Sequence, residues 1–169
     1  MLFRVPITQF SLRWYYEVFS YSAYVDSALL SLRLGLFAAL LAVALGFLAA
    51  YGLVRWKPPG AALLMGLFTA PLVVPAVVFG IAALQFINRI GLYGSFTALL
   101  LAHVVMVMPF AVRTLQAAIE EHGPELEWAA MSLGARRWRA VLLVTVPLCL
   151  RGMIAAYLFC FLISFYEIT

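Results

Sequence analysis

Long apolar runs separated by short polar stretches dominate the chain. Residues 34–54 contain no charged side chain, and a helix of this length spans about 31 Å, enough to cross the hydrocarbon core of a bilayer. Three further apolar runs follow, the first with two internal prolines and the last interrupted early by an arginine. Residues 1–26 are expected to form an external or interfacial segment and residues 27–169 a transmembrane domain. The pattern predicts an all-α, polytopic helical bundle with membrane spans at about 28–54, 61–87, 96–112 and 148–169.

Composition excludes the two main alternatives, a soluble domain and a disordered chain. Hydrophobic residues make up 66% of the 169 residues and charged residues 11%, and the mean hydropathy is +1.06. A chain of this size leaves too much surface exposed to bury so many apolar side chains in water, and disordered chains are rich in charge instead. The net charge of +4 does not indicate nucleic-acid binding, because the basic residues lie between apolar runs, as membrane topology requires.

Basic residues set the orientation of the predicted spans. The first connection carries Arg55 and Lys57, and the second carries Arg89 alone. The third connection carries four arginines: Arg113, Arg136, Arg137 and Arg139. Cytoplasmic loops of membrane proteins carry an excess of Lys and Arg. We therefore expect the loops at 55–60 and 113–147 to be cytoplasmic and the N-terminal segment to lie on the other side of the membrane.

The third connection contains the most informative stretch, GPELEWAAMSLGARRWRAVLLVTVP at residues 123–147. Pro124 suits the first position of a helix, and acidic residues in the turn that follows interact favourably with the helix dipole. Gly134 stands where a helix end needs a left-handed residue. The stretch predicts two short helices joined at this glycine. The first helix would carry a narrow apolar stripe formed by Leu126, Ala129, Ala130 and Leu133, which is typical of a docking surface rather than a catalytic site.

This stretch resembles the cytoplasmic signature of the permease subunits of binding-protein-dependent ATP-binding-cassette importers. The signature, called the EAA motif, reads Glu-Ala-Ala, three residues, Gly, nine residues, and then Ile-x-Leu-Pro. Its glutamate position holds Trp128, and Glu127 lies one residue earlier, which rotates the carboxylate by about 100° around a helix. The chain follows the spacing of the signature at six positions: Ala129, Ala130, Gly134, Val144, Val146 and Pro147.

The resemblance extends over most of the chain, including residues 10–55, the helix with Pro71 and Pro75, and residues 102–115. The final SFYEIT is similar to the Ser-Phe-Asp-Glu stretch of the spermidine/putrescine-type branch, with Tyr in place of Asp, whereas the Gly-Glu-Phe-Gly stretch of the sulfate and molybdate branches is missing. The resemblance implies that, compared with complete members, a first transmembrane helix and the segments after the last residue are missing. We therefore expect a fragment of the type I importer fold, and a polyamine or similar small organic solute.

The resemblance implies a non-enzymatic transport subunit in the bacterial inner membrane. Its partners would be cytoplasmic ATPase subunits, a second permease subunit of the same or a different chain, a periplasmic solute-binding protein and the lipid bilayer. The chain has no Gly-rich phosphate loop, so the partner ATPase would bind the ATP, and no cofactor, metal or catalytic residue is expected here.

In this family the loop around Gly134 inserts a short helix into a groove on each ATPase and couples ATPase closure to the movement of the permease helices. Small residues at the turn would permit close packing. The arginines after the turn would contact the ATPase or lipid headgroups, or would only reflect the topological bias of charge. The residues implied in this coupling are Glu127, Ala129, Ala130, Gly134, Arg136, Arg137, Val144, Val146 and Pro147.

Three further sites within the spans carry polar or helix-breaking residues. Pro71 and Pro75 interrupt a helix and either line or hinge the pathway or only shape packing. Glu167 is ionisable at membrane depth and is a functional candidate for that reason, unless it reaches the outer interface. His103 is interpreted as a hydrogen-bonded packing residue in preference to a proton relay.

Two other functions share parts of this pattern. A gradient-driven secondary transporter or channel fragment would need polar groups that face each other at mid-membrane, and the spans offer little beyond His103 and Gln85. A non-transporting membrane scaffold would keep the docking loop without a pathway.

Overall fold

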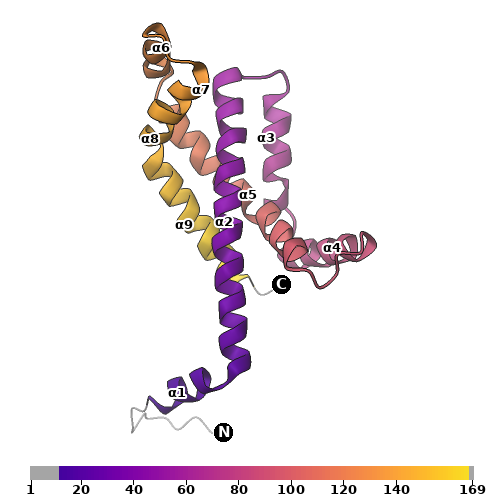
Figure 1. The fold of residues 1–169 in the computed structure, drawn as a ribbon. Helices are drawn as coiled ribbons and strands as arrows, with labels where there is room; N and C mark the ends of the chain where they lie inside the picture. Colours follow the sequence, from indigo (N-terminus) through magenta and orange to yellow (C-terminus); the bar gives the residue numbers. More distant parts are fainter. Residues whose placement is uncertain (1–11, 168–169) are drawn as a thin grey trace, which may run out of the picture.

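A computed structural model describes residues 12–167, and every regular element in this range is helical. The axis of the molecule is α2 (Ser22–Trp56), along which α5 (Phe96–Glu121) and α9 (Leu150–Tyr166) pack (Figure 1). The remaining elements are α1 (Arg13–Ser20), α3 (Ala61–Thr69), the 3-10 helix η1 (Ala70–Leu72), α4 (Ala76–Arg89), α6 (Glu125–Ser132), α7 (Arg137–Ala140), the π-helical segment η2 (Val141–Thr145) and α8 (Val146–Leu148). The all-α prediction is confirmed.

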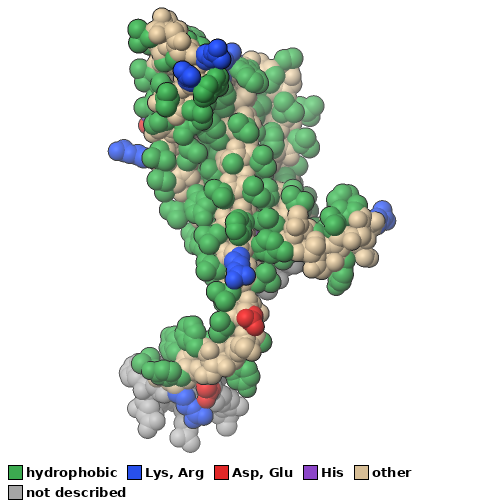
Figure 2. All heavy atoms as spheres, viewed as in Figure 1, with side chains coloured by type: hydrophobic (Ala, Val, Ile, Leu, Met, Phe, Trp, Pro, Cys, Tyr) green, Lys and Arg blue, Asp and Glu red, His purple; other side chains and the backbone are tan. Residues whose placement is uncertain are grey.

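Small residues on α2 allow its neighbours to approach closely. Its buried face carries Gly35, Ala38, Ala39, Ala42, Gly46 and Ala50. A Cβ atom added at Gly46 would lie 2.9 Å from the Cβ of Ala111 on α5, so this crossing requires glycine. Small residues at helix contacts are typical of packing inside a bilayer, where lipid is as apolar as the side chains. Large apolar residues such as Phe37 and Leu48 are exposed instead, and hydrophobic side chains cover much of the visible surface (Figure 2).

By length and composition, two helices in the described range can cross a membrane on their own. These are α2 and α5. Two further spans are possible if each of two bent helix pairs counts as one: the pair from α3 to α4 and the pair from α7 to α9. The four apolar runs of the sequence therefore correspond to two continuous helices and two broken ones.

The run at 61–87 is not the single kinked span that its composition predicts. The helical segments on the two sides of Pro75 meet at 100°, and α4 extends away from the bundle (Figure 1). Each proline removes a backbone donor and crowds the preceding turn of a helix. Pro71 lies within the short 3-10 turn and Pro75 caps α4 with extended backbone, so two such defects four residues apart break the helix.

Other helix bounds differ from the predicted spans. α2 begins at Ser22, before the expected residue 28, and α5 continues to Glu121, well beyond the expected residue 112. Pro109 is accommodated inside α5, and Leu115 and Ile119 are fully buried, which explains why the helix persists into the predicted loop. The last run starts in the bent segment at residues 137–148, which meets α9 at 69°. Residues 168–169 of the predicted span, and 1–11 of the predicted external segment, lie outside the described residues.

The connections at residues 57–60 and 122–149 lie at the same end of the bundle, whereas α1 lies at the opposite end of α2 (Figure 1). This arrangement agrees with an alternating topology in which both connections face one side of the membrane. Several Lys and Arg side chains gather at this end, near α6 and α7 (Figure 2).

Candidate functional site

The helix pair predicted at 123–147 is present and begins with α6. α6 starts at Glu125, one residue after Pro124, and the chain reverses at Gly134. Gly134 has φ of +92°, and its N–H donates to the carbonyl of Met131 at 2.9 Å. A Cβ atom at Gly134 would meet no atom of this chain within 4 Å. The backbone conformation, and not crowding within the chain, therefore requires glycine here.

Glu127 on α6 points inward and is only 5% exposed. Its Oε1 accepts from the Nε of Arg55 at 2.9 Å and from the Oγ1 of Thr145 at 2.8 Å, and its Oε2 accepts from the hydroxyl of Tyr51 at 2.8 Å. We call these four residues the Glu127 cluster. Arg55 also donates to the carbonyl of His122 at 2.7 Å. One carboxylate thus joins the end of α2, the start of α6 and the π-helical segment.

The protonation state of Glu127 follows from two opposing effects. Burial raises the pKa of a carboxyl group, because it penalises the charged form. Hydrogen bonds from Thr145, Tyr51 and Arg55, together with the positive charge of Arg55, outweigh burial and lower the pKa of Glu127 below its ordinary value. Glu127 is therefore ionised at neutral pH and forms a buried ion pair with Arg55, whose side chain is 8% exposed.

The opposite side of α6 faces outward. Trp128, at the glutamate position of the signature, is 57% exposed, and Leu133 is 90% exposed. Ala129 is also exposed and Ala130 is half-buried. The one-residue offset of the carboxylate therefore places Glu127 inside the bundle and Trp128 outside. Of the predicted apolar stripe, Leu126, Ala129 and Leu133 are exposed, whereas Ala130 is half-buried.

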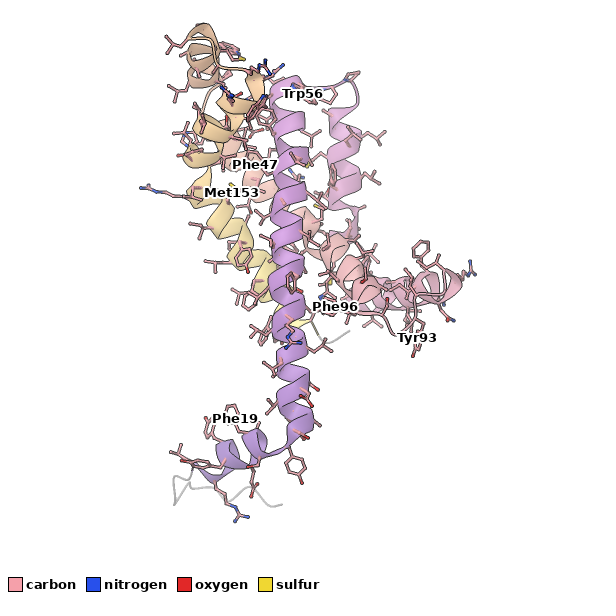
Figure 3. The ribbon with its side chains drawn as sticks, viewed as in Figure 1. Phe19, Phe47, Trp56, Tyr93, Phe96 and Met153 are labelled. Atoms are coloured by element: carbon pink, nitrogen blue, oxygen red, sulfur yellow. The ribbon has the colours of Figure 1, made fainter. Side chains whose placement is uncertain are left out.

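Arginines border this apolar surface. Arg136 and Arg137 are exposed, and the guanidinium of Arg137 lies over the ring of Trp56 at 6.0 Å, which connects α7 to the end of α2. Trp56 lies at the α6–α7 end of the bundle (Figure 3). Arg139 lies 5.1 Å from the ring of its neighbour Trp138. The exposed face thus combines apolar side chains with positive charge, and we call it the α6–α7 surface (Leu126, Trp128, Ala129, Leu133, Arg136, Arg137, Trp138 and Arg139).

The other predicted residues lie apart from this surface. Val144 and Val146 are half-buried in the segment that leads to the last helix, and Pro147 is exposed two residues before the bend at Cys149. Pro71 and Pro75 lie at the break before α4. The structure therefore separates the exposed residues of the predicted loop from the residues at the entry to α9.

Glu167 and His103 line one cavity of about 330 Å³ between α4 and α5. The Nδ1 of His103 lies 2.8 Å from the Oγ of buried Ser164, so this histidine joins α5 to α9, as expected for a packing residue. The rest of the cavity wall is mainly apolar. Glu167 and His103 thus contribute polar groups to the wall of the same cavity.

Sequence reasoning missed three members of the Glu127 cluster: Tyr51, Arg55 and Thr145. The sequence alone indicates only a topological charge for Arg55, at the end of a span. A signal was present, because residues four apart share one face of a helix, and Tyr51 and Arg55 are the polar pair on an otherwise apolar helix end. Thr145 lies in a π-helical segment, a feature often found at functional sites, which sequence alone does not reveal.

Comparisons with known proteins identify the family of the chain. Residues 42–169, more than half of the chain, match the family described as "Binding-protein-dependent transport system inner membrane component". The chain is 36% identical over 149 residues to the molybdenum transport system permease protein ModB of Escherichia coli K12, which covers 80% of this chain and 65% of that protein. It is 31% identical over 155 residues to the E. coli sulfate transport system permease protein CysT, covering 85% of this chain and 56% of that protein.

A third relative is the spermidine/putrescine transport system permease protein PotC of Haemophilus influenzae, which is 28% identical over 160 residues, covering 95% of this chain and 62% of that protein. The chain thus spans less than two thirds of the length of these relatives. The molybdenum and sulfate permeases are at least as similar as the polyamine permease, so the spermidine/putrescine-type branch is one of several and is not singled out. The chain belongs to the family of inner membrane permease components of binding-protein-dependent, ATP-binding-cassette importers.

Proposed function

We propose that this chain forms part of the translocation pathway of an ATP-driven solute importer and that its α6–α7 surface docks onto a separate ATPase subunit. One observation carries the proposal: α6 exposes Trp128 and Leu133 beside arginines, while a buried ion pair fixes its inner side to the bundle. Exposed apolar side chains in a charged rim are typical of protein interfaces. A surface that is both exposed and rigidly anchored is suited to transmit force from a partner.

The orientation of the chain supports the same partner. Both connections that carry most of the basic residues lie at the α6–α7 end, and an excess of Lys and Arg favours the cytoplasmic side of the inner membrane. On this proposal the predicted cytoplasmic segments 55–60 and 113–147, whose connections in the structure are residues 57–60 and 122–149, face the cytoplasm, where an ATPase would be. The second permease subunit and the solute-binding protein would complete the importer on the membrane and periplasmic sides.

The pathway itself would use the bent helix pair from α3 to α4 and the cavity beside α4. Pro71 and Pro75 hold the turn into α4, whose side chains, with those of α5, line the cavity that contains Glu167. A carboxylate in a wall that is apolar apart from His103 would attract a cationic solute and repel an oxyanion. This charge supports a polyamine, as the C-terminal sequence does. The names of the molybdenum and sulfate relatives point to other solutes, and the test must therefore include both kinds.

The proposal is tested with the protein purified together with a candidate ATPase subunit of an importer from the same organism. The complex should form, and ATP hydrolysis should rise when a loaded solute-binding protein is added. Gly134→Val should preserve membrane insertion and abolish this stimulation, because Val cannot adopt the positive φ of the turn without strain. Full transport by the Gly134→Val variant would contradict a coupling role for this loop.

The solute is tested in the same complex. Binding proteins loaded with a polyamine, sulfate or molybdate are compared for stimulation of ATP hydrolysis. Stimulation by the polyamine form, with loss in Glu167→Gln, would support a cationic pathway. Stimulation by an oxyanion form, unaffected by Glu167→Gln, would assign the chain to an oxyanion importer and leave the docking proposal intact.

A further inference from the structure

The Glu127 cluster joins segments that are far apart in the sequence. Tyr51 and Arg55 lie near the end of α2, Glu127 in the first turn of α6, and Thr145 at the end of the π-helical segment. Three donors occupy the carboxylate, each at 2.8 to 2.9 Å. Within the described residues, no buried side-chain nitrogen or oxygen lacks a hydrogen-bond partner.

Burial separates Glu127 from the docking surface. Glu127 is 5% exposed and Thr145 is 1% exposed. The neighbouring Trp128 is more than half exposed on the same helix. A protein that docks on α6 would therefore touch Trp128 and Leu133, and it could not reach the carboxylate without opening the bundle.

The cluster is also the direct link between α6 and the long central helix. α6 packs against α7 and the π-helical segment. The side-chain hydrogen bonds that join α6 to α2 in the described range, from Tyr51 and Arg55, both end on Glu127. Arg55 in addition holds the carbonyls of His122 and Gly123 at 2.7 and 3.5 Å, directly ahead of α6. Any displacement of α6 must move the end of α2 or break this ion pair.

We propose that Glu127 is a positioning residue through which movement of α6 is transmitted to α2 and to the segment that leads into α9. This inference rests on the proposed function, because it assumes that α6 receives the movement from an ATPase. Arg55 supplies the charge that makes the link stiff, since an ion pair removed from water is stronger and more directional than one at the surface. Tyr51 and Thr145 fix the orientation of the carboxylate.

The test separates docking from transmission. Complexes of the full-length protein with its ATPase are prepared for Glu127→Gln, Arg55→Gln and Tyr51→Phe, with Glu120→Gln as a control. Glu120 is an exposed carboxylate near the end of α5 that accepts from Gln116 at 2.8 Å. Three quantities are measured for each complex: recovery of the ATPase with the permease, ATP hydrolysis without solute-binding protein, and hydrolysis with it.

Glu127→Gln should still recover the ATPase, because the α6–α7 surface is unaltered. The ratio of stimulated to unstimulated hydrolysis should fall about tenfold, within the usual range of coupling between sites. Arg55→Gln should lower the ratio similarly, Tyr51→Phe should lower it less, and Arg55→Lys should restore part of it because the charge is kept. Glu120→Gln should match the wild type.

Several results would overturn the inference. If Glu127→Gln keeps the wild-type ratio of stimulated to unstimulated ATP hydrolysis, movement is transmitted without the cluster. Stimulation of the wild-type complex would still support docking in that case. Loss of ATPase recovery in Glu127→Gln would make Glu127 an assembly residue instead. If Glu127→Gln does not accumulate in the membrane, Tyr51→Phe decides, because it removes a single hydroxyl and an unchanged ratio there would contradict the inference. If the ATPase does not co-purify with the wild-type permease, the proposed function itself is contradicted.

Discussion

The Nε atom of Arg55 lies 2.9 Å from Oε1 of Glu127, and this contact joins positions 72 residues apart in the chain. Between them lie α3, the 3-10 helix η1, α4 and all of α5. The ion pair therefore closes the bundle at the α6–α7 end and fixes α6 relative to α2. Its two side chains are almost removed from solvent, which distinguishes it from the exposed pair between Arg13 and Glu17.

Removal of one partner of this ion pair should destabilise the protein strongly. Arg55→Met leaves the Glu127 carboxylate buried without its counter-charge, which typically costs about 3–5 kcal/mol. The double variant Arg55→Met/Glu127→Met should recover part of this loss, because no unpaired charge remains, although the hydroxyls of Tyr51 and Thr145 lose their acceptor. The midpoint of thermal unfolding in detergent measures both effects.

The matched control for this prediction is Arg113→Met, which removes an exposed arginine from α5. Surface substitutions of this kind usually change stability by about 0.5 kcal/mol or less. Equal midpoints for Arg55→Met and Arg113→Met would mean that the buried ion pair does not stabilise the bundle.

The stability of the cluster should depend on pH in one direction. The pKa of Glu127 is lowered from 4.5, so its ionised form favours the folded state above that pH, and this contribution is lost as the pH falls through the folded-state pKa. The midpoint difference between wild type and Glu127→Gln should be largest near neutral pH and shrink in acid. A difference that grows on acidification would contradict the lowered pKa. Both proteins are compared across one pH series at constant salt.

The contact between α2 and α5 should be sensitive to a single methyl group. Gly46→Ala would place a Cβ 2.9 Å from the Cβ of Ala111, whereas Gly66→Ala in α3 meets nothing within 4 Å. Alanine in a helix otherwise gains about 0.5–1 kcal/mol over glycine. We expect Gly66→Ala to be neutral or stabilising and Gly46→Ala to lower the unfolding midpoint. Equal effects of the two substitutions would argue against the close α2–α5 packing.

The requirement for glycine at position 134 should be one of backbone conformation. Asn tolerates positive φ better than other residues with a side chain, and no atom of this chain crowds the position. Gly134→Asn should therefore retain more solute-stimulated ATP hydrolysis than Gly134→Val. Equal loss in both variants would show that the space beside Gly134 is filled by the partner, as close packing against an ATPase would require.

Much of the fold can be predicted from the sequence because lipid-facing helices leave a strong hydropathy signal. The long uncharged run before Arg55 and the turn at Gly134 follow from local patterns, and both are present in the structure. The bounds are less predictable. α5 continues to Glu121 because Leu115 and Ile119 find partners in the bundle, which no local pattern reveals.

The candidate site is harder to predict than the spans. The signature spacing leads to α6 and its exposed face, but it gives no indication that Glu127 turns inward. That orientation depends on Arg55 and Tyr51, which reach α6 only through tertiary packing across the bundle. The wide bend at Pro71 and Pro75 is a further case, since one proline predicts a kink whereas the pair produces a break of 100°.

The central claim is that the exposed face of α6 docks onto an ATPase, and cross-linking from Leu133 tests it most directly. A Leu133→Cys variant presents a thiol at a position that is 90% exposed, while Cys149 and Cys160 are 1% and 0% exposed and should not react. In membranes that contain the whole importer, this thiol should cross-link to the ATPase and resist labelling from the periplasm. Labelling from the periplasm, or an exposed cytoplasmic thiol that never cross-links to the ATPase, would contradict the account.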